Sequence, residues 1–163
     1  MKNTGKFVQI IGIIIAPIAL FCCSTNNYDS ISIYTLIANN ALLAHSNELE
    51  INKYANNVSA NKFIVDQAIK MSILDDEDIR NIFIEFNKIE VENYIINIKN
   101  KRIIINDTKN YWLSQIAFNK NKTIAIIFEN DNIIPRAGHG IFYVLIKENE
   151  KWKIVGQIFK WTS

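Results

Sequence analysis

The sequence contains few of the residues that define disulfide-rich, collagen-like or proline-rich proteins. Its 163 residues include five glycines, two prolines and two cysteines, which are adjacent at Cys22 and Cys23. Two neighbouring cysteines cannot build a disulfide framework or a cysteine-based zinc site. Disorder is also excluded, because 49% of the residues are hydrophobic and only 21% are charged. A chain of this length suits a single domain.

An excess of charge is also missing once the N-terminus is set aside. The chain carries 18 Lys and Arg against 16 Asp and Glu. Lys2 and Lys6 are the only charged residues before residue 24, so the rest balances 16 basic against 16 acidic residues. Nucleic-acid-binding domains carry a clustered basic face. We therefore expect no nucleic-acid partner.

Sequence motifs for catalysis are absent. The chain has no G-x-S-x-G, no H-E-x-x-H and no G-x-x-x-x-G-K motif. Its histidines are His45 and His139. A Ser-His-Asp arrangement stays open, because its members can lie far apart in sequence. The sequence thus leans against an enzyme, and it predicts no metal site, no cofactor and no catalytic residue.

The N-terminus has the pattern of an export signal. Residues 1–6 are basic, residues 7–21 are almost wholly apolar and residues 24–27 are polar. The apolar run is shorter than the roughly 20 residues of a membrane-spanning helix. We predict a signal peptide over 1–23, a tether over 24–30 and one domain over 31–163. A retained anchor helix or a buried core helix are the alternatives.

The end of this segment, Leu20-Phe21-Cys22-Cys23, resembles the lipobox of bacterial lipoproteins. The resemblance implies that a cysteine becomes the first mature residue and carries lipid, which partitions into a membrane. Cys23 is the expected lipidation site, since the small Cys22 precedes it. Cys22 is the alternative, and bulky Phe21 makes it less suitable. Ser24 implies outer-membrane sorting in a host that has one, whereas plain signal cleavage would release a secreted protein.

Periodicity predicts helices in the first half of the mature chain. Apolar residues at helical spacing indicate a helix over residues 30–44, and Ile79, Ile82, Phe83 and Phe86 form the stripe of a second helix over 75–87. Alternation predicts a half-buried strand over 48–54. Residues 62–74 are ambiguous between strand and helix, and helix is favoured only in the second half of this stretch.

The last third has the pattern of a sheet. Strands are expected at 114–118, 123–130, 140–148 and 152–161, with Gly156 at a bulge. Short turns between consecutive strands require antiparallel pairing. We predict an α+β fold in which N-terminal helices pack on one face of a C-terminal four-stranded antiparallel meander. Folds of the NTF2-like or cystatin-like kind are one form of this arrangement.

This third also resembles an uncharacterised family of secreted bacterial proteins. The family pattern contains G-x-G-x-Y-Y-x-L-x-K, then W-K-(V/I), then W-x-S. It is carried here by Leu113–Asn119, Lys122–Ala125, Gly138–Leu145, Trp152–Ile154 and Trp161–Ser163. Two features depart from the family: residues 133–137 lack its cysteines, and Lys151 replaces its usual glycine. The resemblance implies export and this fold, and no activity.

One cluster is a candidate for ligand or protein contacts. Asp131, Arg136 and His139 are expected in the loop between the second and third strands, and Tyr143 follows in the third. An arginine can bind a carboxylate through two parallel hydrogen bonds, and a histidine can exchange protons near neutral pH. The alternative is an ordinary solvent-exposed hairpin loop.

Taken together, these features predict an exported cell-envelope protein. We expect it at the outer membrane or periplasmic face through a lipid anchor, or secreted, and acting as a non-enzymatic interaction or structural module with a protein partner. One alternative is a small-ligand-binding domain or weak hydrolase with a pocket between helices and sheet. Another is a lipid-anchored immunity or inhibitor protein.

Overall fold

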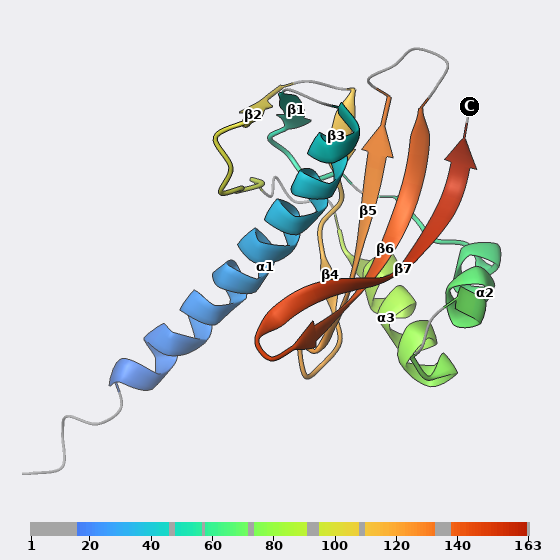
Figure 1. Ribbon diagram of the computed structural model, residues 1–163. Helices are drawn as coiled ribbons and strands as arrows, with labels where there is room; N and C mark the ends of the chain where they lie inside the picture. The colour runs from blue at the N-terminus through green and yellow to red at the C-terminus, as the bar shows by residue number, and fades with distance from the viewer. Residues whose placement is uncertain are drawn as a thin grey trace, which may run out of the picture.

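The computed structural model describes the backbone of residues 16–45, 48–56, 58–71, 74–90, 95–107, 110–132 and 138–162. Side chains are described within these ranges except for 16–27, 44–45 and 161–162. The described elements are grouped into helices, a large antiparallel sheet and a small parallel sheet (Figure 1). The helices are α1 (Ala16–His45), α2 (Lys62–Met71) and α3 (Asp76–Lys88).

The large sheet follows the predicted meander. Its strands are β3 (Tyr111–Leu113), β4 (Ala117–Phe118), β5 (Ile124–Asp131), β6 (His139–Glu148) and β7 (Lys151–Thr162). The order is β3-β5-β6-β7, β4 also pairs with β5, and every pairing is antiparallel. The predicted α+β class and C-terminal antiparallel sheet are confirmed. The small sheet pairs β1 (Leu49–Asn52) in parallel with β2 (Ile103–Asn106).

The strand predicted over 114–118 is confirmed only at its end, where β4 covers 117–118. β3 precedes the predicted range, and Ser114 lies between the two short strands. Ser114 is fully buried, and its Oγ accepts a hydrogen bond of 2.8 Å from the backbone N–H of Phe128. The N–H of Ser114 donates in turn to the Phe128 carbonyl at 2.8 Å. The serine hydroxyl therefore accepts the hydrogen bond of a β5 backbone N–H at the point where β3 ends. Both short strands pair with the same edge of β5.

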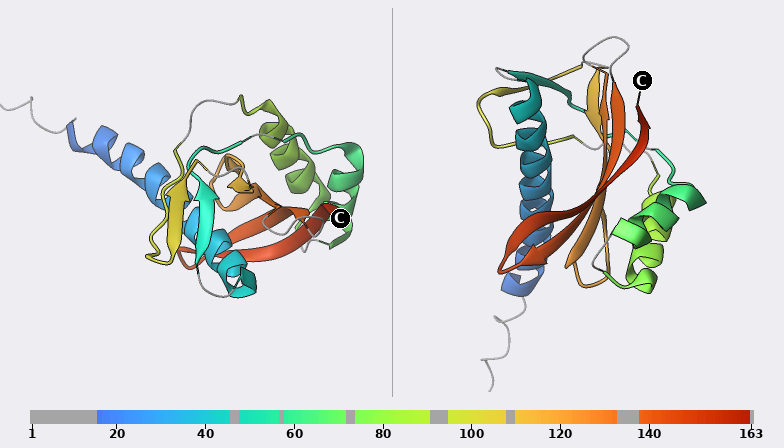
Figure 2. Two further views of the ribbon diagram at one scale, coloured as in Figure 1. Left: turned by 90° about the horizontal axis from the view of Figure 1, so that it is seen from above. Right: turned by 45° about the vertical axis from the view of Figure 1, so that its right-hand side comes forward.

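The helices cover both faces of the large sheet, whereas the sequence predicts helices on one face. Figures 1 and 2 show α1 on one side and α2 and α3 on the other. Ala125 and Ile127 of β5 belong to the core beneath α1, and Ile126 and Phe128 belong to the core beneath α2 and α3. All eight residues of β5 are buried. A strand that is apolar on both sides needs cover on both faces.

Helix α1 is longer than the sequence predicts. It begins at Ala16 rather than near Ser30, so its backbone is helical across 24–30, where a tether is expected. No glycine or proline interrupts the chain between Pro17 and His45, and proline is tolerated in a first helical turn. Within the described part of the chain, no helix combines the length and the apolar character that crossing a membrane requires.

An aromatic core joins α3 to the sheet. The ring of Phe142 lies 4.8 Å from that of Phe128, 5.5 Å from Phe86 and 5.7 Å from Phe83, centroid to centroid. The predicted stripe of α3 is thus confirmed as its buried face. Asp75 occupies the N-cap position, but its side chain makes no capping hydrogen bond.

Gly156 lies at a bulge, as predicted. Val144 pairs with Gly156 while Leu145 pairs with Ile154, so one residue of β7 is left over. A Cβ on Gly156 would lie 3.4 Å from the Cβ of Val144. This extra residue increases the twist of the β6–β7 pair, which Figure 2 shows curving across the helices.

Candidate functional site

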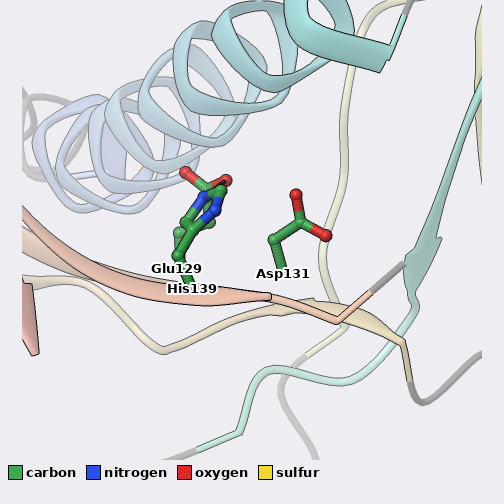
Figure 3. Close-up of side chains that lie close together, drawn as sticks. All are labelled: Glu129, Asp131 and His139. Carbon is green, nitrogen blue, oxygen red and sulfur yellow. Dashed lines mark ion pairs between the residues drawn. The ribbon is translucent and has the colours of Figure 1, made fainter. Parts of the chain in front are cut away.

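The candidate site lies where β5 ends and β6 begins, on the face that α1 covers. Glu129 and Asp131 are two residues apart on β5 and therefore share one face of the sheet. His139 is the first residue of β6 and pairs directly with Asp131 across the ladder. The three side chains point from the sheet towards the side on which α1 lies (Figure 3). One ligating atom from each lies within 4.8 Å of the others.

Two members of this cluster are buried and the third reaches solvent. Glu129 is 2% exposed and Asp131 is 4% exposed, whereas the His139 side chain is 30% exposed. The Nε2 atom of His139 lies 3.6 Å from Oε1 of Glu129. The Glu129 carboxylate, through hydrogen bonding and charge, raises the pKa of His139 above its ordinary value of 6.5, against the opposing effect of partial burial.

Two tyrosines flank the carboxylates. Tyr111 of β3 is fully buried and Tyr143 of β6 is 2% exposed. Burial and then the negative charge of Glu129 raise the pKa of both hydroxyls far above the ordinary value of 10. Both therefore stay protonated at neutral pH and can serve as donors. Tyr143 interacts with Glu129 and with Asn40 of α1, which connects the cluster to the helix.

Two polar atoms at this site lack a conventional partner. Within the described residues, neither Oε2 of Glu129 nor the hydroxyl of Tyr111 makes a hydrogen bond of normal length and angle, although both are buried. Buried polar atoms are nearly always satisfied by protein, water or a ligand. Each exception needs an explanation, and here two exceptions occur side by side.

The structure brings together three of the four residues expected from the sequence. Asp131, His139 and Tyr143 lie on one face of β5 and β6. Asp131 and His139 form the last residue pair of the β5–β6 ladder, whereas the sequence predicts that both lie in the loop. Arg136 lies outside the described residues, as does the side chain of His45.

Sequence reasoning missed Glu129, the more buried of the two carboxylates at the site. The sequence does contain a signal for Glu129. It is an acidic residue that follows a run of apolar residues in a predicted strand, and it lies two residues before Asp131. An acid at a buried strand position is rare unless it is paired. Its partner His139 is ten residues away and on another strand, so no compact motif marks the pair.

The donor set of this site is one imidazole nitrogen and two carboxylate oxygens, which suits a divalent cation. Comparison with family models, curated proteins and solved structures finds no match to this chain.

Proposed function

We propose that this chain is a cell-envelope lipoprotein, held through Cys23, whose single domain binds a partner or ligand rather than catalysing a reaction. The N-terminal pattern of residues 1–23 and the neutral charge of the remainder support export and anchoring. The observation that supports the proposal is the packing of Asp29 onto the sheet, because the packed domain then begins only six residues after Cys23, the proposed lipidation site.

Asp29 is buried against the turn that joins β6 to β7. It is 4% exposed, its Oδ1 accepts a hydrogen bond of 3.0 Å from Nε1 of Trp152, and the same oxygen lies 3.0 Å from Nζ of Lys147. Asp29 follows Cys23 by six residues. Six helical residues rise about 9 Å. A lipid on Cys23 would thus hold this end of the domain close to the membrane surface.

The candidate site would then face away from the membrane. Helix α1 runs from the end that carries the β6–β7 turn towards the end where β5 passes to β6 (Figures 1 and 2). Strand β6 spans the distance between these ends, and its ten residues extend over about 33 Å. The cluster of Glu129, Asp131 and His139 would be open to soluble molecules of the envelope.

Ligand binding is the form of this function that the site favours. A purely structural module needs no carboxylate in the position of Glu129, because a buried polar group without a full set of partners is costly to desolvate. Glu129 and Asp131 are both at least 96% buried, and His139 exposes one side of the cluster. We therefore place the binding role at this end of the sheet.

Palmitate labelling tests the anchor. Cells that express the wild type, Cys23→Ser or Cys22→Ser are grown with radiolabelled palmitate, and the immunoprecipitated protein is counted. We expect label in the wild type and in Cys22→Ser, since serine is a small residue at the position before the anchor, and no label in Cys23→Ser. Absence of label in the wild type, or equal label in all three, would contradict lipidation at Cys23.

A further inference from the structure

The candidate site contains a buried carboxylate oxygen, Oε2 of Glu129, that makes no hydrogen bond of normal length and angle within the described residues. Glu129 and Asp131 bring two carboxylates into the interior between α1 and the sheet, and His139 is the only described basic group that an ion pair links to Glu129. Charged groups are retained in protein interiors when they are paired or when they coordinate a metal. Within the described residues, Glu129 is compensated by the imidazole of His139, which is 30% exposed and lies 3.6 Å away, and by interactions with the neutral hydroxyls of Tyr111 and Tyr143. None of these places a full positive charge in the interior beside the carboxylate.

Two buried atoms of the site, Oε2 of Glu129 and the hydroxyl of Tyr111, suggest that a ligand binds here. Oε2 of Glu129 makes no hydrogen bond of normal length and angle within the described residues, and neither does the fully buried hydroxyl of Tyr111, although the two side chains interact. Oε1 of Glu129 faces His139 in an ion pair. Oε2 is therefore the carboxylate oxygen that remains available to a ligand. A cation would use that oxygen, and the neutral Tyr111 hydroxyl could then orient the coordinating carboxylate, as outer hydrogen bonds do at metal sites.

The geometry is close to that of a coordination shell. The donor atoms of Glu129, Asp131 and His139 already lie within 4.8 Å of one another. A tetrahedral zinc ion with bonds of about 2.0–2.2 Å holds its donors roughly 3.4 Å apart. The donor atoms would have to approach one another by at most about 1.4 Å, which side-chain rotation can provide. Because the three residues stand on adjacent antiparallel strands, the backbone needs no rearrangement (Figure 3).

The donor types select the class of ion. Calcium and magnesium prefer shells made only of oxygen atoms. An imidazole nitrogen favours first-row transition ions, and carboxylates are common partners of zinc. Three protein donors also leave a fourth position for water or an external ligand. The 30% exposure of His139 provides the side from which that position is reached.

We propose that Glu129, Asp131 and His139 form a three-residue binding site for a divalent transition-metal ion of the zinc type, with one coordination position open to solvent. The hydroxyls of Tyr111 and Tyr143 interact with the carboxylate of Glu129 from the strands on either side of β5. This inference depends on the folded domain and not on the lipid anchor, so the palmitate experiment and the metal experiment fail independently.

The test is titration of the full chain with zinc. The protein is purified in detergent without a polyhistidine tag, stripped with a chelator and titrated with ZnCl2 by calorimetry, with MgCl2 and CaCl2 as comparison ions. We expect one Zn²⁺ per chain, reversal by chelator and at least tenfold weaker binding of Mg²⁺ and Ca²⁺. Replacement of Zn²⁺ by Co²⁺ should add visible absorption bands.

Variants assign the site. Glu129→Gln and His139→Gln should each weaken zinc binding by tenfold or more, because each removes a direct ligand. His45→Gln is the matched control, since His45 is the chain's other histidine, and it should bind as the wild type does. If buried Glu129→Gln fails to fold by circular dichroism, the half-exposed His139→Gln decides the assignment. Absence of zinc binding in the wild type, equal binding in wild type and His139→Gln, or calcium binding as tight as zinc would overturn the proposal.

Discussion

The contact of Asp29 with Trp152 should be the main polar link between α1 and the β6–β7 turn. The two residues are 123 positions apart, and the hydrogen bond of 3.0 Å is buried. The same carboxylate raises the pKa of Lys147, which therefore stays charged at neutral pH. Removal of Asp29 deletes the acceptor of a buried indole N–H and leaves Lys147 without its nearest buried anion.

The expected cost follows from these contacts. A hydrogen bond to a charged group contributes about 1.5–3 kcal/mol. Lys147 is 20% exposed, so solvent screening limits its ion pair to about 1 kcal/mol or less. Asp29→Ala should therefore lower the free energy of unfolding by about 2–4 kcal/mol. Asp29→Asn, which keeps an oxygen acceptor and loses the charge, should cost about half as much.

A double-mutant cycle isolates the hydrogen bond. Trp152→Phe removes the N–H donor, and the cycle of Asp29→Ala with Trp152→Phe subtracts the change in packing. Urea unfolding is followed by far-UV circular dichroism, with m-values compared to confirm that the unfolded states match. A coupling energy of about 1.5–3 kcal/mol is expected. A value under about 0.5 kcal/mol would refute the assigned role of this contact.

Two further predictions concern the core and the site. Phe142→Ala should lower the free energy of unfolding by about 3–5 kcal/mol in urea, because it empties the centre of the aromatic core, whereas Phe159→Ala, at a side chain 53% exposed, should cost under about 1 kcal/mol. Equal losses would contradict the packing. In the metal-free chain, the raised pKa of His139 stabilises the fold below pH 6.5, and this contribution is lost as the pH rises through the folded-state pKa. His139→Gln should thus be less stable than wild type near pH 5.5, and the difference should shrink above that pKa; a gap that widens with pH would contradict the pairing with Glu129.

Much of the local structure was predictable, because side-chain periodicity reports it directly. The stripe of α3 and the alternation of β1 both appear as buried faces. The last three predicted strands, the antiparallel pairing and the bulge at Gly156 are confirmed, whereas β3 lies outside the strand predicted over 114–118. The position of α1 was not predictable in this way. Its apolar residues indicate that it packs against something, but they do not say against which face of the sheet.

The candidate site was predictable only in part. Asp131, His139 and Tyr143 stood out as polar or aromatic residues near a hairpin connection, and the structure places all three on the face beneath α1. Glu129 did not stand out, because its environment is set by the residues that cover it. Glu129 is buried because α1 covers this face of β5, and that contact is tertiary.

The sequence by itself therefore determined the α+β class and the antiparallel order of β5, β6 and β7, since hydrophobic spacing and turn length act over a few residues. Tertiary structure alone decided that the sheet is covered on both faces, that Asp29 meets Trp152, and that Glu129, Asp131 and His139 converge. These contacts join segments that are separated along the chain. They depend on the register of paired strands and on which face each helix covers, and neither is encoded in the local pattern of any one segment.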